Sequence, residues 1–223
     1  MKRTLILSFL ALFFYSQAYS QLIDGFGLTF GAGLSNQYWD YQNANFNGIG
    51  GWKSNKTGAN CQLYVEKYMN SNFSFRPSIG YIQKGFTEET ILLINEPENI
   101  SVKDKRIIEH MLSLDLPFKV VASNFDMKPY FLLGLRMNYL LDARGILMDY
   151  NGEEIELNTD LYDDFRKFTL GTLFGAGISY KDIFFIEIKF NPAITHNFDS
   201  ALLSIHDRYF GVTAGFNVQS LLQ

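Results

Sequence analysis

Ionisable side chains in several parts of the sequence alternate with apolar residues, as Glu187 does between Ile186 and Ile188. The acids and bases in these positions are nearly balanced in number. Their expected chemistry is therefore mutual pairing in a site shielded from water, because a buried charge needs a partner. The residues of this predicted structural charge network are Glu66, Arg76, Lys84, Glu109, Asp115, Lys119, Arg136, Glu187 and Lys189.

Residues of the kind found in hydrolases lie close together near the C-terminal end. A nucleophilic serine needs a histidine base and a carboxylate that orients it. The candidates are Asp199, Ser200, Ser204, His206 and Asp207. Closeness in sequence does not establish that geometry, and an ordinary polar loop has a similar composition. We therefore predict no catalytic residues and no enzymatic activity, with an outer-membrane lipid-modifying enzyme as the alternative.

Metal, cofactor and nucleic-acid sites are not indicated by the sequence. His110, His196 and His206 lack a fixed ligand spacing, and Cys61 is the single cysteine. The glycine-rich run 25–33 lacks the strand-to-helix context of a dinucleotide site. With a formal net charge of −4, the chain shows no basic face for nucleic acid. We predict no metal, no cofactor and no nucleic-acid partner.

The charged positions belong to stretches whose apolar residues recur with period two, which indicates β-strands. In the first stretch, Phe26, Leu28 and Phe30 alternate with Gly27 and Thr29. The pattern predicts eight strands, at about 26–35, 58–70, 72–86, 106–121, 127–141, 166–180, 183–192 and 207–218. No run of about 18 apolar residues follows the N-terminal segment, which excludes membrane-spanning helices.

Connections between these strands alternate in length. Short turns are expected at 70–72, 122–124 and 181–182, and long polar loops at 37–57, 87–105, 142–165 and 193–206. Short turns in the periplasm and long loops outside the cell are typical of outer-membrane barrels. We predict an all-β fold, an eight-stranded antiparallel up-and-down transmembrane β-barrel, in the cell outer membrane.

Orientation of the strand faces separates a membrane barrel from a soluble one. We expect the apolar faces to meet lipid and the polar faces to fill the narrow lumen. A soluble lipocalin-like binding barrel would have the opposite orientation and is a further alternative. Several aromatic residues near strand ends are candidates for interfacial girdles, although aromatics also favour strands in general. They are Tyr68, Phe73, Tyr81, Phe86, Tyr139, Phe168, Tyr180 and Phe198.

An N-terminal export signal is predicted by the basic Lys2 and Arg3, the apolar run 5–15 and the small residues of 18–20. Cleavage is expected before Gln21, which gives a signal peptide over 1–20 and one barrel domain over 21–223. The signal would carry the chain through the inner membrane. Cys61 has no partner for an internal disulfide.

Six segments in order resemble the PorT-like outer-membrane β-barrel family of Bacteroidota. They are FGLTFGAGLSN (26–36), RPSIGYIQKGF (76–86), LSLDLPFKV (112–120), KPYFLLGLRMNYLL (128–141), FTLGTLFGAGISY (168–180) and YFGVTAGFNV (209–218). The resemblance implies an outer-membrane barrel, usually of unassigned biochemical role. One family member supports type IX secretion, a role that we do not transfer. The tail from Gln219 to Gln223 departs from the aromatic ending common in assembly signals.

Together these observations predict a small barrel with a side-chain-filled lumen and a structural or interaction role carried by four long extracellular loops. An accessory role in secretion or envelope assembly is one form of that hypothesis. The expected partners are outer-membrane lipid and lipopolysaccharide, the barrel-assembly machinery during insertion, and other envelope proteins.

Overall fold

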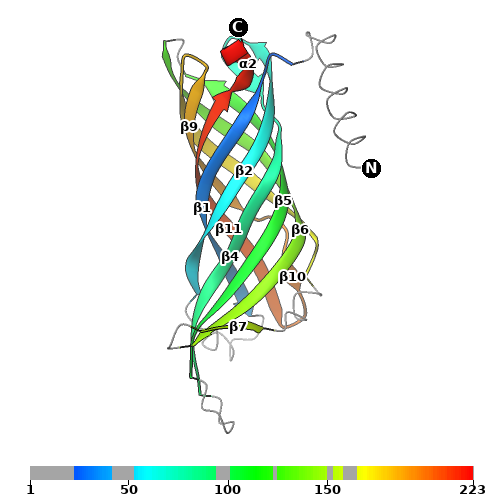
Figure 1. Cartoon of the computed structure of the whole chain (residues 1–223). Helices are drawn as coiled ribbons and strands as arrows, with labels where there is room; N and C mark the ends of the chain where they lie inside the picture. The colour runs from blue at the N-terminus through cyan, green and yellow to red at the C-terminus, as the bar shows by residue number, and fades with distance from the viewer. Residues whose placement is uncertain are drawn as a thin grey trace, which may run out of the picture.

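The computed structural model describes residues 23–41, 53–93, 101–122, 125–149, 153–157 and 165–222, and the predicted signal peptide lies outside them. These residues form strands and one short C-terminal helix (Figure 1). The strands are β1 (Gly25–Tyr41), β2 (Lys53–Asn70), β3 (Phe73–Phe75), β4 (Ser78–Leu93), β5 (Ser101–Val121), β6 (Met127–Asp149), β7 (Glu154–Leu157), β8 (Phe168–Tyr180), β9 (Phe184–Pro192), β10 (Phe198–Asp199) and β11 (Leu203–Asn217). The helix is α2 (Val218–Leu222).

The long strands close into a ring of antiparallel neighbours in the order β1, β2, β4, β5, β6, β8, β9 and β11. The first and last strands complete it, since Phe30 of β1 lies opposite Ala214 of β11 and opposite Cys61 of β2. Each long strand pairs with the next long strand along the chain. The predicted eight-stranded up-and-down barrel is confirmed.

The predicted strand 72–86 is divided into β3 and the first part of β4 by Arg76 and Pro77. Proline has no N–H with which to continue the ladder. The interruption is local, because the Arg76 backbone N–H donates to the Pro117 carbonyl at 2.9 Å and the Pro77 carbonyl accepts from the Val65 N–H at 3.0 Å. Both parts therefore occupy the same place in the ring.

Several strands extend far into the segments predicted as long loops. β4 continues to Leu93, β5 begins at Ser101 and β6 continues to Asp149, so much of the predicted loops 87–105 and 142–165 is strand. Alternation of apolar and polar residues ends before backbone pairing does. Charged cross-strand neighbours, such as Glu88 opposite Lys105, are expected where the paired strands lie beyond the apolar layer.

The two faces of the sheet have opposite chemistry. On β9, Ile186 is 63% exposed on the outside of the ring, whereas the next residue, Glu187, is 1% exposed inside it. The same holds on β6, where Phe131 and Leu133 lie outside and Arg136 lies inside. This orientation is the reverse of that in a soluble binding barrel. An apolar exterior with a polar interior is the arrangement of a membrane barrel.

The inner face of β1 carries small residues, and large rings from other strands lie over it. A Cβ atom on Gly33 would stand 2.4 Å from the ring of Tyr209, and one on Gly27 would stand 2.7 Å from the hydroxyl of Tyr64. These glycines are therefore required by close packing. Among the described residues, no helix is long and apolar enough to cross a bilayer.

Candidate functional site

The centre of the lumen holds an ion pair between β5 and β6. Arg136 donates from Nε to Asp115 Oδ1 at 2.6 Å and from Nη2 to Asp115 Oδ2 at 2.6 Å. The two residues lie directly opposite one another in the strand register, and both are buried. Two parallel charge-assisted hydrogen bonds of this kind are strong and fix the relative geometry of both groups.

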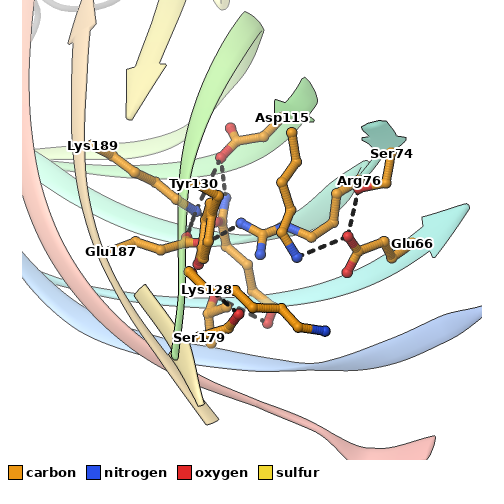
Figure 2. Close-up of polar contacts among 12 residues, drawn as sticks. Glu66, Ser74, Arg76, Asp115, Lys128, Tyr130, Ser179, Glu187 and Lys189 are labelled. Carbon is orange, nitrogen blue, oxygen red and sulfur yellow. Dashed lines mark hydrogen bonds and ion pairs between the residues drawn. The ribbon is translucent and has the colours of Figure 1, made fainter. Parts of the chain in front are cut away.

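Glu187 on β9 connects several elements across the lumen. It pairs with Arg76, accepts a hydrogen bond from the Tyr130 hydroxyl at 2.6 Å, and lies 3.3 Å from Lys189 Nζ. Figure 2 shows these side chains converging in the barrel interior. One buried carboxylate thus joins β6, β9 and the residue between β3 and β4.

Glu66 forms the part of the network nearest the short turns. Lys119 Nζ lies 3.0 Å from Glu66 Oε1, and the Ser74 hydroxyl donates to the same oxygen at 2.6 Å. The Lys119 ammonium also lies 4.7 Å from the centroid of the Tyr130 ring. Tyr130 therefore contacts both this pair and the Glu187 group.

Lys189 and Gln62 join the Glu187 group to the central pair. Lys189 Nζ lies 3.9 Å from Asp115 Oδ2 and donates to Gln62 Oε1 at 3.4 Å. Gln62 in turn donates from Nε2 to Asp115 Oδ2 at 3.2 Å. Charged and polar groups are thus in contact from Arg76 to Arg136 along the inside of the barrel.

A second charged group lies nearer the long loops. Lys84 Nζ is 3.6 Å from Asp207 Oδ2, and Glu109 accepts a hydrogen bond from Gln37 Nε2 at 2.6 Å. All nine residues of the predicted network are buried inside the barrel, and Asp207 is buried with them. With Asp207 included, five bases face five acids, so this group of ten residues is formally neutral.

The sequence analysis places Asp207 at the first position of the predicted strand 207–218 and groups it with the hydrolase-type residues, and it misses the place of Asp207 in the lumen. Asp207 has the same parity as Tyr209 and Gly211, the inward positions of β11, and that signal was present in the sequence. Gln37 was predicted to lie in a loop. Asn60 donates to the Tyr209 hydroxyl at 2.7 Å, and as a neutral residue it carries no charge signal in the sequence.

An apolar cluster fills the interior toward the long loops. Phe86, Ile107, Phe165 and Ile205 form its buried centre, and Trp39, Leu140, Ala143, Phe198 and Leu203 pack around it. The prediction of Phe86 as an interfacial residue is wrong, because Phe86 has the same parity as Lys84 and points inward with 0% exposure. Phe198 also packs against this cluster. The girdle candidates Tyr68, Tyr139, Phe168 and Tyr180 are exposed.

The five hydrolase-type residues do not assemble into a serine triad. The Ser204 hydroxyl donates to Asp199 at 3.1 Å, and the Ser200 hydroxyl accepts from the backbone N–H of Leu203 at 3.2 Å within a turn. Asp207 is inside the barrel. Within the described part of the chain, no hydrogen bond joins a serine hydroxyl to a histidine ring.

The three histidines are divided between two places. His196 and His206 have ring centroids 4.1 Å apart, whereas His110 lies on the outer face of β5 with Nδ1 2.6 Å from the Tyr81 hydroxyl. No group of three or more His, Cys, Asp or Glu residues suited to a metal ion occurs among the residues that the structure describes.

A closed antiparallel ring with an apolar exterior and a charged, filled interior defines an outer-membrane β-barrel. The chain belongs to the outer membrane protein beta-barrel domain family, whose model matches residues 16–199. Its location is accordingly the outer membrane. No curated protein sequence matches the chain.

Several solved structures are similar to this chain, and OprG shares its fold. OprG from Pseudomonas aeruginosa is similar over 87% of this chain and 96% of its own, with 10% identity and a TM-score of 0.51. Ail, the attachment invasion locus protein of Yersinia pestis, covers 86% and 97% with 15% identity and a TM-score of 0.38. The outer membrane enzyme PagL covers 85% and 99% with 9% identity and a TM-score of 0.42.

Proposed function

We propose that this protein is a rigid, closed membrane scaffold whose role is structural or adhesive and is carried by its loops. The observation that supports it is the filling of the lumen along its length. Ion pairs occupy the centre, and the apolar cluster around Phe86 occupies the end toward the long loops. An eight-stranded barrel is just wide enough for such side chains, so the lumen provides stability and the loops provide the contact surface.

The two ends of the barrel differ in a way that supports a specific orientation. At one end β8 and β9 are joined by a tight turn, in which Lys181 and Asp182 have φ values of 51° and 56°, as type I′ hairpins require. At the other end the strands extend beyond the apolar layer. We place the tight turns in the periplasm and the long connections outside the cell.

The scaffold would bind envelope proteins through these outer connections, while lipid and lipopolysaccharide surround the wall and the barrel-assembly machinery acts during insertion. Within its family the chain would group with the PorT-like barrels, on the six sequence segments that resemble them. An accessory role in secretion or envelope assembly is compatible with this scaffold and needs no chemistry in the lumen.

Catalysis is not part of the proposal. The contact that argues against it is the hydrogen bond from the Ser204 hydroxyl to Asp199, because a nucleophilic serine must give its proton to a base such as histidine. Purified protein would be incubated with phospholipid and with lipopolysaccharide. Turnover that is lost in Ser204→Ala or His206→Ala would restore the enzyme alternative.

The experiment that tests the scaffold is a crosslinking pull-down from intact cells. One version of the chain carries an affinity tag between β4 and β5, and the matched version carries it ahead of Ile23, at the turn end of the barrel. We expect antibody to reach only the first tag on intact cells, and the same envelope proteins to be recovered with both versions. Labelling of the second tag alone would show that the barrel has the opposite orientation. Recovery of no envelope protein with either version would contradict the interaction role.

A further inference from the structure

The outer wall changes from apolar to polar at the same level on β1 and β11. Leu34 and Phe210 form an opposed pair, and the next outward-facing pair toward the loops is Asn36 and Arg208. Leu34 and Phe210 are both exposed on the exterior. Since the chain is an outer-membrane barrel, this step marks the level at which the hydrocarbon layer ends and the lipid headgroups begin.

Arg208 is exposed at this boundary and lies against an aromatic ring. Its guanidinium carbon is 5.3 Å from the centroid of the Tyr38 ring, and Tyr38 is itself exposed. Among the described residues, no carboxylate lies within 4.0 Å of Arg208. By contrast, Arg144 is also exposed but donates to Asp142 at 2.9 Å. Arg208 therefore lies against Tyr38, and none of the acids in the described part of the chain pairs with its charge.

Two imidazole rings and two acids lie further toward the loops than Arg208. His206 lies opposite Tyr38 in the register, and its ring centroid lies 4.1 Å from that of His196, with the two rings tilted relative to each other. Asp40 lies on the same face, one outward position further toward the loops and opposite Ser204, and Asp199 lies 3.8 Å from His196. A planar guanidinium suits phosphate oxygens because it can donate two parallel hydrogen bonds, and a tyrosine ring at the interface restricts its position.

We propose that Arg208 and Tyr38 form a binding site on the outer wall for the phosphate of a phosphorylated glycolipid in the outer leaflet. The lipid's acyl chains would lie against the exterior of Leu34, Phe210 and Val212, and its phosphate would meet the guanidinium. This inference rests on the proposed orientation, with the long connections outside the cell. A membrane lipid, and not free phosphate, is the proposed source of the phosphate, because Arg208 lies directly beyond the apolar part of the outer wall.

The test uses the full mature chain in phosphatidylcholine nanodiscs that contain diphosphoryl lipid A, with bound lipid measured by native mass spectrometry. Arg208→Gln should lower the fraction of protein with bound lipid A by about fivefold, as expected for the loss of one charged contact at an interface. Tyr38→Leu should lower it by about twofold. Arg144→Gln, the matched control with a charge already paired, should leave it unchanged.

Two further measurements test whether the phosphate is recognised as part of the lipid. Dephosphorylated lipid A should bind the original chain and Arg208→Gln equally, and inorganic phosphate should not compete with the lipid. Equal lipid A binding by Arg208→Gln and Arg144→Gln would overturn the proposal, as would competition by free phosphate. Because binding in nanodiscs does not depend on which end faces the cell exterior, failure here is distinct from failure of the tag experiment, and a heat-modifiability gel verifies that each variant is folded.

Discussion

Asp115 and Arg136 lie opposite one another on adjacent strands and are joined by two hydrogen bonds, each 2.6 Å long, at the centre of the barrel. Both side chains are almost completely removed from solvent. A buried ion pair of this kind is not in itself proof of high stability, because burying each charge has a cost. Removing only one of the two side chains, however, leaves the other charge buried without its partner. The stability of such a variant therefore tests whether the charges of the interior are paired.

Arg136→Leu should lower the free energy of unfolding by about 3–5 kcal/mol, because Asp115 is left buried with fewer cations around it. Urea unfolding in lipid vesicles would measure the change, and the chain should unfold at a lower temperature on a gel. Arg144→Leu removes an exposed ion pair and should change stability by less than about 1 kcal/mol. Equal effects of the two substitutions would contradict a paired interior.

Asp207→Leu should also destabilise the barrel by about 3 kcal/mol or more, since Lys84 remains as a buried cation without its nearest acid. The double variant Lys84→Met with Asp207→Leu should recover much of that loss, because no charge is then left alone. A double-mutant cycle in urea measures the coupling between the two sites. Additive losses would show that Asp207 does not pair with Lys84.

Phe86→Ala should cost about 3–5 kcal/mol, because Phe86 is enclosed by Ile107 and Ile205 and its removal leaves a cavity. Phe168→Ala, an exposed aromatic on the outer wall, should cost clearly less. The comparison separates an interior residue from an interfacial one by thermal unfolding. If Phe168→Ala were the more destabilising change, the position assigned to Phe86 would be in doubt.

Ile186→Arg places a charge on the lipid-facing wall and should destabilise the inserted barrel by about 2–4 kcal/mol. Leu202→Arg, at an exposed position in the connection before β11, should have little effect. Folding yields into vesicles of defined thickness would compare the two variants. A tolerated arginine at 186 would be inconsistent with contact between this face and hydrocarbon.

Steady ion conductance should be absent or very small when the purified chain is inserted into a planar bilayer. The filled centre and the apolar cluster leave no wide aqueous route at this strand number. Heat-denatured protein at the same concentration provides the baseline. Stable, stepwise openings in many independent insertions would require a lumen different from the one described.

Period-two patterning was sufficient to predict the barrel, the strand count and the direction of each face. It works here because lipid and a charged lumen impose opposite chemistry on successive residues, as at Ile186 and Glu187. All nine charges assigned to the lumen lie there in the structure. Their particular partners were not predictable, because Arg76 and Glu187 meet across the ring from strands far apart in sequence.

The errors at the loop end of the barrel have a common physical origin. Beyond the lipid layer the exterior is polar, so alternation fades although backbone pairing continues. Weak alternation therefore predicts a loop at Gln37 and hides the inward position of Asp207, and Phe86 has the inward parity of Lys84 although it stands near a strand end. The division between β3 and β4 depends on Pro77, and the proline is a sequence signal for such an interruption.

The small-residue inner face of β1 bears on how the protein reaches its final form. β1 and β11 meet at the junction that completes the cylinder, and the inward positions of β1 from Gly25 to Gln37 carry no ionised group. Salt bridges among the other strands need not be broken or exchanged when this junction seals. The Asp115–Arg136 pair of the neighbouring strands β5 and β6 can thus precede closure. In the final step β1 and β11 pair through their backbones, and glycines of β1 receive the rings of Tyr64 and Tyr209.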